Sequence, residues 1–318
     1  MPKLLAYIAS WDYSTIGILA DVGGFISIND SDDFPTGYMP SDMTLIRENN
    51  LLVISDAGNA TLTYFRVGGA ATNLYDRKRV AVALDKPGPL VRKRGMPHLF
   101  VLDFHGGRAT RVTYADGIFV PSGDAFDTPL DAACVCNDTG RGLVFAVNNS
   151  GSVLNVLAVS GDCLSLVATH KVPDVYLPNS ITYLRDYIFI SGVGGIGCYR
   201  FDDAGNQLTH LCTINDERFV AMKIAADRKR DLVYATSCFS LMRMNFIEGE
   251  KRFVIQSKVV TDNYGDDELC YDADSRKMFV LRTSINTVSV IDLSLVDEWD
   301  GLVATDIRTR FTPTIACF

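Results

Sequence analysis

The sequence predicts an all-β protein that folds as a single seven-bladed β-propeller. Three observations lead to this prediction. A strongly apolar run recurs seven times at nearly constant spacing, each run stands among further short strands, and the two ends of the chain each supply part of one blade. A period in the mid-forties with four strands per repeat is typical of propeller blades.

The apolar run is the clearest repeated element. Its seven copies are LLAYIAS (4–10), LLVISDA (51–57), HLFVLDF (98–104), LVFAVNN (143–149), YIFISGV (187–193), LVYATSC (232–238) and MFVLRTS (278–284). With Tyr7, Val53, Phe100, Phe145, Phe189, Tyr234 and Val280 taken as equivalent, the successive spacings are 46, 47, 45, 44, 45 and 46 residues. Such regularity over the whole chain indicates a repeat architecture.

Each run is predicted to be the second strand of a four-stranded blade. Alternating segments such as VLNVLAV (153–159) and CLSLVAT (163–169) follow it as third and fourth strands, joined by polar turns. A segment such as ELCYD (268–272) precedes it as the first strand. The alternation has a period of two residues and no long stretch has a helical period, so strands are expected throughout.

The chain ends predict how the ring closes. The sequence begins with a second strand at 4–10 and ends with TPTIACF (312–318), which has the pattern of a first strand. We therefore expect residues 313–318 to pair with 4–10 and complete blade one from both termini. Residues 1–318 would then form one domain, because no blade can bury both of its faces alone.

Composition limits the classes of partner. The net charge is −8, and the basic cluster of DRKRV (76–80) and VRKR (91–94) is local and outweighed by acidic residues elsewhere, so nucleic-acid binding is not expected. No apolar run is long enough to cross a membrane. The eight cysteines form no CxxC pairs and lie mostly in apolar strands, which favours buried thiols, a reducing compartment and hence the cytoplasm. We expect a monomer that acts on a small molecule.

The hairpin segments resemble a known group of propellers. CYRFDDAGNQLTHL (198–211), NVLAVSGDCLSLV (155–167) and YIASWDYSTIGIL (7–19) are similar to phrases of the seven-bladed lactonase-like propellers, which include 6-phosphogluconolactonases and carboxy-muconate lactonising enzymes. The resemblance implies a lactonase or cyclase type of enzyme that binds an anionic or lactone-like substrate at the mouth of the central channel. In those relatives arginines and a histidine hold an acidic substrate, and the nearest analogues by kind are Glu217-Arg218 and His105.

A second resemblance implies a metal. LPNSITYLRDYIFIS (177–191) and DDELCYDADSRKMFVL (266–281) look like segments of the gluconolactonase (senescence-marker) propellers, which bind a divalent cation in the channel. The matching ligands for Ca²⁺ or Mg²⁺ would be Asp42, Asp131, Asn179 and Asp267. Asp131 stands where that pattern has an amide, and those relatives have six blades. Clustered carboxylates could equally serve as a general acid or base, or simply form turns.

Loops at the same rim supply the remaining candidates. His105 follows the third apolar run and could transfer a proton, oriented by Asp103, although a partly exposed loop imidazole fits the position equally well. Substrate contacts are predicted for Arg218 and Arg282, whose guanidinium groups match anions, and for Trp11, Asp56 and Asn148. The alternative function is a non-catalytic propeller that binds a protein or peptide, because a fold does not dictate its function.

Overall fold

The structure is a computed structural model of the chain. It describes residues 3–10, 14–23, 25–29, 34–68, 72–93, 95–128, 132–138, 140–148, 151–193, 195–215, 223–237, 240–260, 268–272, 275–282, 287–293, 304–308 and 314–317.

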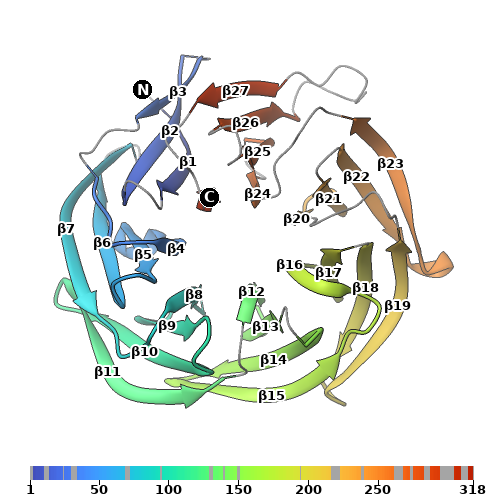
Figure 1. Cartoon of the computed structure of the whole chain (residues 1–318), viewed down its shortest axis with the longest axis horizontal. Helices are drawn as coiled ribbons and strands as arrows, with labels where there is room; N and C mark the ends of the chain where they lie inside the picture. The colour runs from blue at the N-terminus through green and yellow to red at the C-terminus, as the bar shows by residue number, and fades with distance from the viewer. Residues whose placement is uncertain are drawn as a thin grey trace.

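The described residues form seven four-stranded antiparallel sheets arranged as a ring, as predicted (Figure 1). The strands of each blade are given from the centre outward. Blade one contains β28 (Thr314–Cys317), β1 (Lys3–Ser10), β2 (Thr15–Val22) and β3 (Phe25–Asn29), and blade two contains β4 (Pro40–Ile46), β5 (Leu51–Asp56), β6 (Thr61–Gly68) and β7 (Asn73–Ala81). Blade three contains β8 (Pro87–Val91), β9 (His98–Asp103), β10 (Arg108–Ala115) and β11 (Ile118–Asp127), and blade four contains β12 (Ala132–Asp138), β13 (Leu143–Asn148), β14 (Val153–Ser160) and β15 (Cys163–Lys171).

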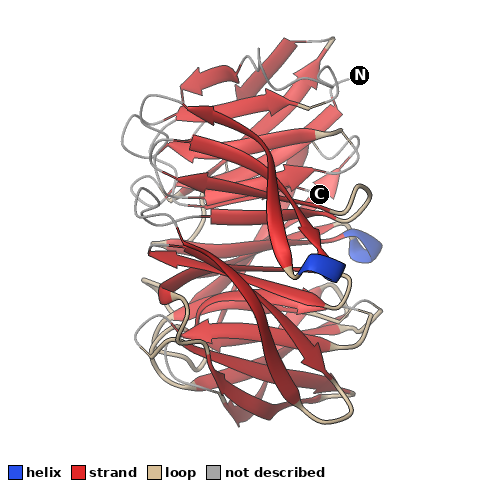
Figure 2. Ribbon diagram, turned by 90° about the vertical axis from the view of Figure 1, so that its right-hand side faces the viewer, coloured by secondary structure: helices blue, strands red, loops and turns tan. Residues whose placement is uncertain are grey.

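The remaining three blades have the same plan. Blade five contains β16 (Tyr176–Leu184), β17 (Tyr187–Val193), β18 (Gly195–Asp202) and β19 (Gln207–Asn215). Blade six contains β20 (Lys223–Asp227), β21 (Leu232–Ser237), β22 (Ser240–Ile247) and β23 (Arg252–Val260). Blade seven contains β24 (Glu268–Asp272), β25 (Lys277–Arg282), β26 (Thr287–Asp292) and β27 (Ala304–Arg308). Two single 3₁₀ turns among the described residues, at Arg47–Asn49 and Glu248–Glu250, connect β4 to β5 and β22 to β23. The strands run across the thickness of the ring between two rims of loops (Figure 2).

Blade one is built from both ends of the chain, which confirms the predicted closure. The C-terminal strand β28 pairs with β1 in an antiparallel register in which Ala9 lies opposite Thr314 and Ala6 lies opposite Cys317. The sheet that begins with β1, β2 and β3 is therefore completed by β28. This closure covers the inner edge of β1, so blade one has four strands like the other blades.

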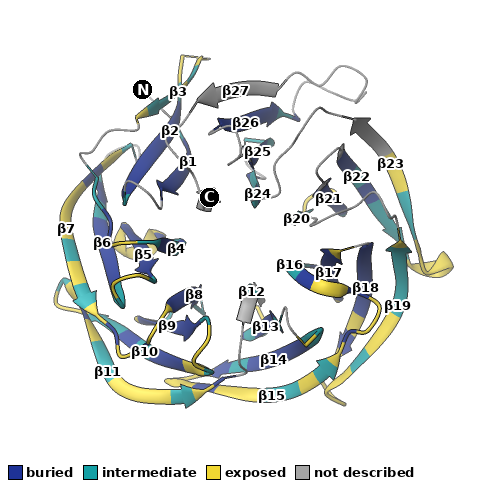
Figure 3. Cartoon of the chain, viewed as in Figure 1, coloured by how far each residue is buried: buried dark blue, intermediate teal, exposed yellow. Residues whose placement is uncertain are grey.

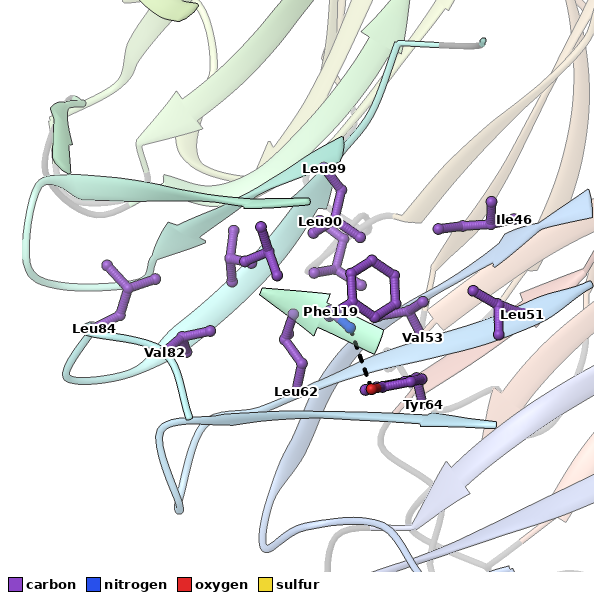
Figure 4. Close-up of a cluster of buried hydrophobic side chains, with 12 residues drawn as sticks. Ile46, Leu51, Val53, Leu62, Tyr64, Val82, Leu84, Leu90, Leu99 and Phe119 are labelled. Atoms are coloured by element: carbon purple, nitrogen blue, oxygen red, sulfur yellow. Dashed lines mark hydrogen bonds between the residues drawn. The ribbon is translucent and has the colours of Figure 1, made fainter. Parts of the chain in front are cut away.

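Packing between blades explains why the second strands are apolar at consecutive positions rather than at every other one. In β5, Leu51 and Val53 pack in a cluster with residues of blade three, whereas Leu52 and Ile54 pack with residues of blade one. Alternate side chains of a strand point to opposite faces, so a strand with both faces covered is apolar throughout. Figure 4 shows the cluster between blades two and three, where the Tyr64 hydroxyl accepts the Phe119 backbone N–H at 3.2 Å.

The described residues contain seven buried clusters, one for each interface between adjacent blades. The last of them joins Phe279 and Val288 of blade seven to Leu5 and Ile8 of blade one. The core is therefore a continuous annulus, and the outermost strands are its solvent-facing wall (Figure 3). Such a rigid annulus fixes the positions of the side chains on its innermost strands.

Two further observations concern helices that could cross a membrane and the state of the cysteines. No helix within the described residues has the length and apolar character needed to cross a membrane. Five cysteines with described side chains (Cys134, Cys136, Cys163, Cys198 and Cys212) are free thiols. Cys270 differs from the expected thiols because it is disulfide-bonded. Disulfides are typical of oxidising compartments, so a cytoplasmic location stays a prediction.

Candidate functional site

The innermost strands surround a central cavity of about 370 Å³. Its lining comes from six of the seven blades, and the polar side chains in it include Asp42, Cys134, Asn179, Ser180, Lys223 and Glu268. Apolar lining residues such as Val135, Ile181 and Leu269 lie among them. A concave cavity with a few converging polar groups is the usual form of a small-molecule site.

Four of these polar residues lie at the same level of the channel. Asp42, Cys134, Ser180 and Lys223 pair with Ser55, Val147, Ser191 and Thr236, each of which is two residues beyond the repeat residue of its blade. Equivalent positions in a propeller lie at equal distances along the axis. The repeat therefore brings a carboxylate, a thiol, a hydroxyl and an ammonium group from four blades into one ring of side chains.

Asp42 is held in place by backbone contacts on both carboxylate oxygens. Oδ1 accepts the N–H of Met43 at 2.8 Å, and Oδ2 accepts the N–H of Leu90 on the next blade at 2.7 Å. Burial of the carboxyl group in the channel wall raises its pKa to about 6, against the smaller lowering effect of these two hydrogen bonds. A carboxyl group with a pKa near neutrality is suited to proton transfer.

Lys223 supplies positive charge to the same cavity. Its Nζ donates to the backbone oxygen of Asn179 at 2.9 Å, which ties the start of β20 to blade five. Lys223 also lowers the pKa of the Cys134 thiol, but burial has the larger effect and raises that pKa to about 12. Cys134 is therefore a neutral thiol at physiological pH, and Lys223 is the cationic group of the described cavity lining.

Lys223 was not among the residues singled out from the sequence. The available signal was a lysine at a channel-facing position at the start of a first strand, KIAAD (223–227), in which three apolar residues follow it. Recognising it requires the blade register, because the same residue on an outer strand would be an ordinary exposed lysine. Glu268, at the start of β24, also lines the cavity.

The segments at the start of the first strands of blades two and five contain the same motif. YMPSD (38–42) and YLPNS (176–180) align residue for residue, and both Met39 (φ 56°) and Leu177 (φ 43°) have left-handed backbones. Bulky residues rarely adopt that conformation, and strained residues cluster at functional sites. The strain precedes the cavity-lining pairs Ser41-Asp42 and Asn179-Ser180, and both tyrosines are exposed.

The predicted metal ligands are partly located by the structure. Asp42 and Asn179 line the same cavity, whereas Asp131 and Asp267 lie outside the described residues. Within the part of the chain that is described, no three His, Cys, Asp or Glu side chains are grouped closely enough to hold a metal ion. The ammonium group of Lys223 in the same cavity disfavours a divalent cation beside it.

Three predicted residues occupy one equivalent position, the last residue of the second strand. These are Asp56, Asp103 and Asn148, each three residues beyond the repeat residue of its blade. Each accepts hydrogen bonds from nearby backbone. Asn148 Oδ1, for example, accepts the N–H of Gly151 at 2.7 Å. Their shared local role is to hold the rim loops in place.

Asp56 and Asp103 are the buried members of this set. Asp103 accepts the backbone N–H groups of Asp85, His105 and Gly106, each at 3.0 Å. Asp56 accepts the N–H of Gly37 at 2.9 Å, the Thr63 hydroxyl at 2.6 Å and the Thr61 hydroxyl at 3.2 Å. Burial raises the pKa of Asp56 to about 6.

His105 is exposed and stands beside the cavity rather than in its described lining. The residue before it, Phe104, does line the cavity, and the two rings lie 6.5 Å apart. Asp103 contacts the His105 backbone N–H, which fixes the loop. Trp11 and Arg218 lie outside the described residues, and the described part of Arg282 is the backbone at the end of β25.

The fold is shared with several solved structures of low sequence identity. A protein from Bacteroides uniformis, provisionally described as a 6-phosphogluconolactonase, superposes with a TM-score of 0.79 at 13% identity over 99% of both chains. The periplasmic gluconolactonase of Pseudomonas aeruginosa gives 0.77 at 12% identity over 98% of both chains. A functionally unknown protein from Desulfotomaculum acetoxidans gives 0.74 at 13% identity over 98% of both chains. No family model and no curated protein matches the sequence.

Proposed function

We propose that the chain is a small-molecule enzyme of the lactonase or cyclase type, which acts on an anionic or lactone-like substrate in the central channel. The observation that carries this proposal is that a carboxyl group and an ammonium group, those of Asp42 and Lys223, line one cavity of about 370 Å³. The two residues come from equivalent positions of different blades, so the rigid ring holds both in place.

The proposed reaction is the addition of water to a lactone carbonyl. The Asp42 carboxylate accepts a proton from the attacking water as the oxygen–carbon bond forms. The bond from the carbonyl carbon to the ring oxygen then breaks, and the proton passes to that oxygen to give a hydroxyl group. The product is a hydroxy acid. A general base contributes roughly 10²–10⁴-fold to such a step when its pKa lies near the working pH.

The role assigned to Lys223 is to bind the negative charge of the substrate or to stabilise the developing oxyanion. Its ammonium group has a fixed partner in the Asn179 backbone oxygen and retains further N–H donors for a ligand. An ammonium group in a partly dehydrated cavity stabilises a nearby anion more strongly than it would in water. A cyclase would use the same two groups in reverse, to close a lactone ring.

The names of the fold relatives support the class of reaction. Two are called 6-phosphogluconolactonases provisionally and a third is called a gluconolactonase, while all match the chain at 12% to 13% identity. The roles predicted for His105, Asp103, Arg218, Arg282, Trp11, Asp56 and Asn148 remain proposals for the same rim. Cytoplasmic location and a monomeric state are likewise proposed, and fractionation and sedimentation would test them.

The test is a pH-stat assay on sugar and alicyclic lactones, with and without a phosphate or carboxylate substituent. We expect the protein to hydrolyse at least one anionic lactone. Lys223→Met should raise the KM for that lactone roughly 10–100-fold, as the loss of a charged hydrogen bond would. Lys251→Met, in an outer turn, is the control and should change nothing. Failure of every lactone at rates above the spontaneous reaction would contradict the proposal.

A divalent cation is a separate proposal for the same channel. The set Asp42, Asp131, Asn179 and Asp267 would hold Ca²⁺ or Mg²⁺ through oxygen ligands, against the opposing positive charge of Lys223 in the same cavity. Metal analysis of protein purified without chelator, followed by melting with and without EDTA, decides it. Bound metal and a lower Tm in EDTA would support the cation, and absence of both would remove it.

The rival function is a module that binds a protein or peptide at one rim. It is favoured by three exposed apolar residues of blade five, Tyr176, Leu177 and Val193, of which Tyr176 and Val193 lie directly opposite each other. If no substrate is found, the protein is screened for protein and peptide ligands, with and without substitution of these three residues by serine. A ligand that binds the unmodified protein and is lost on substitution would support a rim-binding module, whereas no ligand would leave only an inactive channel.

A further inference from the structure

Two cysteines of blade five lie opposite each other on neighbouring strands. Cys198 of β18 and Cys212 of β19 are direct partners in the antiparallel register. No other pair of cysteines is matched in this way in the described strands. Directly opposed residues have Cα atoms about 4.5 or 5.5 Å apart and side chains on the same face.

The two thiols are in contact. A hydrogen bond joins the Cys198 and Cys212 side chains. A disulfide needs Cα atoms roughly 4.4–6.8 Å apart, a range that includes both kinds of antiparallel pair. The backbone therefore already has the spacing of a disulfide, and only the sulfur atoms need to change their bonding.

Their surroundings make the two thiols unequal. Cys198 is fully buried in the cluster between blades five and six, whereas Cys212 is only half-buried against it. The hydrogen bond from Cys198 lowers the pKa of the Cys212 thiol, and burial raises that of Cys198. A thiol with more thiolate and more access to solvent reacts first with an oxidant.

We infer that Cys198 and Cys212 form a redox-sensitive pair that a peroxide converts into a disulfide across β18 and β19. The Cys212 thiolate attacks hydrogen peroxide, the O–O bond breaks, and hydroxide leaves, which gives a sulfenic acid at Cys212. The Cys198 sulfur then attacks the Cys212 sulfur, the S–O bond breaks, and water leaves. Overall, two thiols and one peroxide give one disulfide and two waters.

The local strand geometry favours this step. The register shifts directly beside the pair, where Tyr199 pairs with His210 and Leu211 is an extra residue on β19. Such bulges disrupt the ladder locally, so β19 can adjust there more easily than within a regular pair of strands. β19 is also an outer strand of its blade, where displacement disturbs the core least.

The test is peptide mapping of the folded full-length chain after brief exposure to hydrogen peroxide. We expect a peptide in which residues 198 and 212 are linked, with both thiols recovered after reduction. Cys163→Ser, which removes an exposed cysteine of blade four, should give the same linked peptide. In Cys198→Ser, Cys212 should instead proceed to the sulfinic acid, because no partner thiol remains to capture the sulfenic acid.

Two results would overturn the inference. One is overoxidation of Cys212 in the unmodified protein without any link to Cys198, and the other is full alkylation of both thiols after peroxide treatment. Oxidation of the chain in denaturant serves as the reference. Because the unmodified protein carries the main measurement, a variant that does not fold leaves the test intact.

Discussion

Asp42 and Ser180 occupy equivalent positions in blades two and five, and each accepts a backbone N–H from the first strand of the following blade. Asp42 Oδ2 lies 2.7 Å from Leu90 N, and Ser180 Oγ lies 3.2 Å from Ile224 N. A hydroxyl group is therefore sufficient for this contact between blades. The carboxyl group at position 42 is more than the fold requires, and it is the group that lies in the cavity.

The first prediction concerns stability at this position. Asp42→Ser should melt within a few degrees of the unmodified protein, because serine can make the contact that Ser180 makes. Asp42→Ala should be less stable by about 1–3 kcal/mol, since the Leu90 N–H loses its acceptor. Thermal and urea unfolding measure both. Equal losses in the two variants would show that the carboxylate itself stabilises the channel.

The second prediction concerns the dependence of stability on pH. The pKa of Asp42 is about 6 in the folded chain and near 3.8 when unfolded, because burial disfavours the charged form. Between these values the folded state holds the proton more tightly, so the contribution of Asp42 to stability falls as pH rises from about 4 to 6. The full difference is on the order of 3 kcal/mol.

Unfolding free energies at several pH values check this prediction. The stability of the unmodified protein relative to Asp42→Ser should decrease between pH 4 and pH 7 and then level off. Asp56, whose pKa is also raised to about 6, adds a fall in the same window to both proteins and cancels in the comparison. A difference that stays constant with pH would show that Asp42 has an ordinary pKa.

The third prediction concerns ring closure. Deletion of residues 313–318 removes β28, the only described partner on the inner edge of β1. Blade one then loses its innermost strand, so the Tm should fall by about 10 °C or more, at about 2–4 °C for each kcal/mol of lost stability. Addition of the missing segment as a synthetic peptide should restore part of the loss. A truncated chain that melts like the intact one would contradict closure by β28.

The fourth prediction separates loop structure from catalysis at the rim. Asp103→Ala leaves three backbone N–H groups without their acceptor and should destabilise the protein by more than about 3 kcal/mol. His105→Ala removes an exposed side chain, so it should leave stability unchanged and kcat within about threefold if Asp42 is the base. A loss of kcat in His105→Ala with normal folding would instead assign proton transfer to His105.

The fold could be predicted almost completely from the sequence because a local pattern of apolar strand residues repeats in every blade. Runs such as LLVI (51–54) are apolar at every position for one physical reason, burial on both faces, and that reason holds in every blade. The segment 312–318 then supplies the one strand that the blade of β1, β2 and β3 lacks. Register and spacing alone therefore determine the number of blades and the way that they close.

The site was less predictable because it depends on which residues of different blades lie at the same level. Asp42 and Asn179 could be selected as channel residues, but Lys223 becomes meaningful only once its position is aligned with that of Asp42. Conversely, Asp103 has the residue type expected of a catalytic partner, yet it holds the backbone of its loop. Residue type alone does not distinguish these two roles.

The most direct test is the kcat of Asp42→Ser for the best lactone substrate at pH 7, measured on a sample whose melting matches that of the unmodified protein. We expect a fall of roughly 10²–10⁴-fold with little change in stability. Unchanged turnover in a correctly folded Asp42→Ser protein would show that the carboxyl group in the channel performs no chemistry.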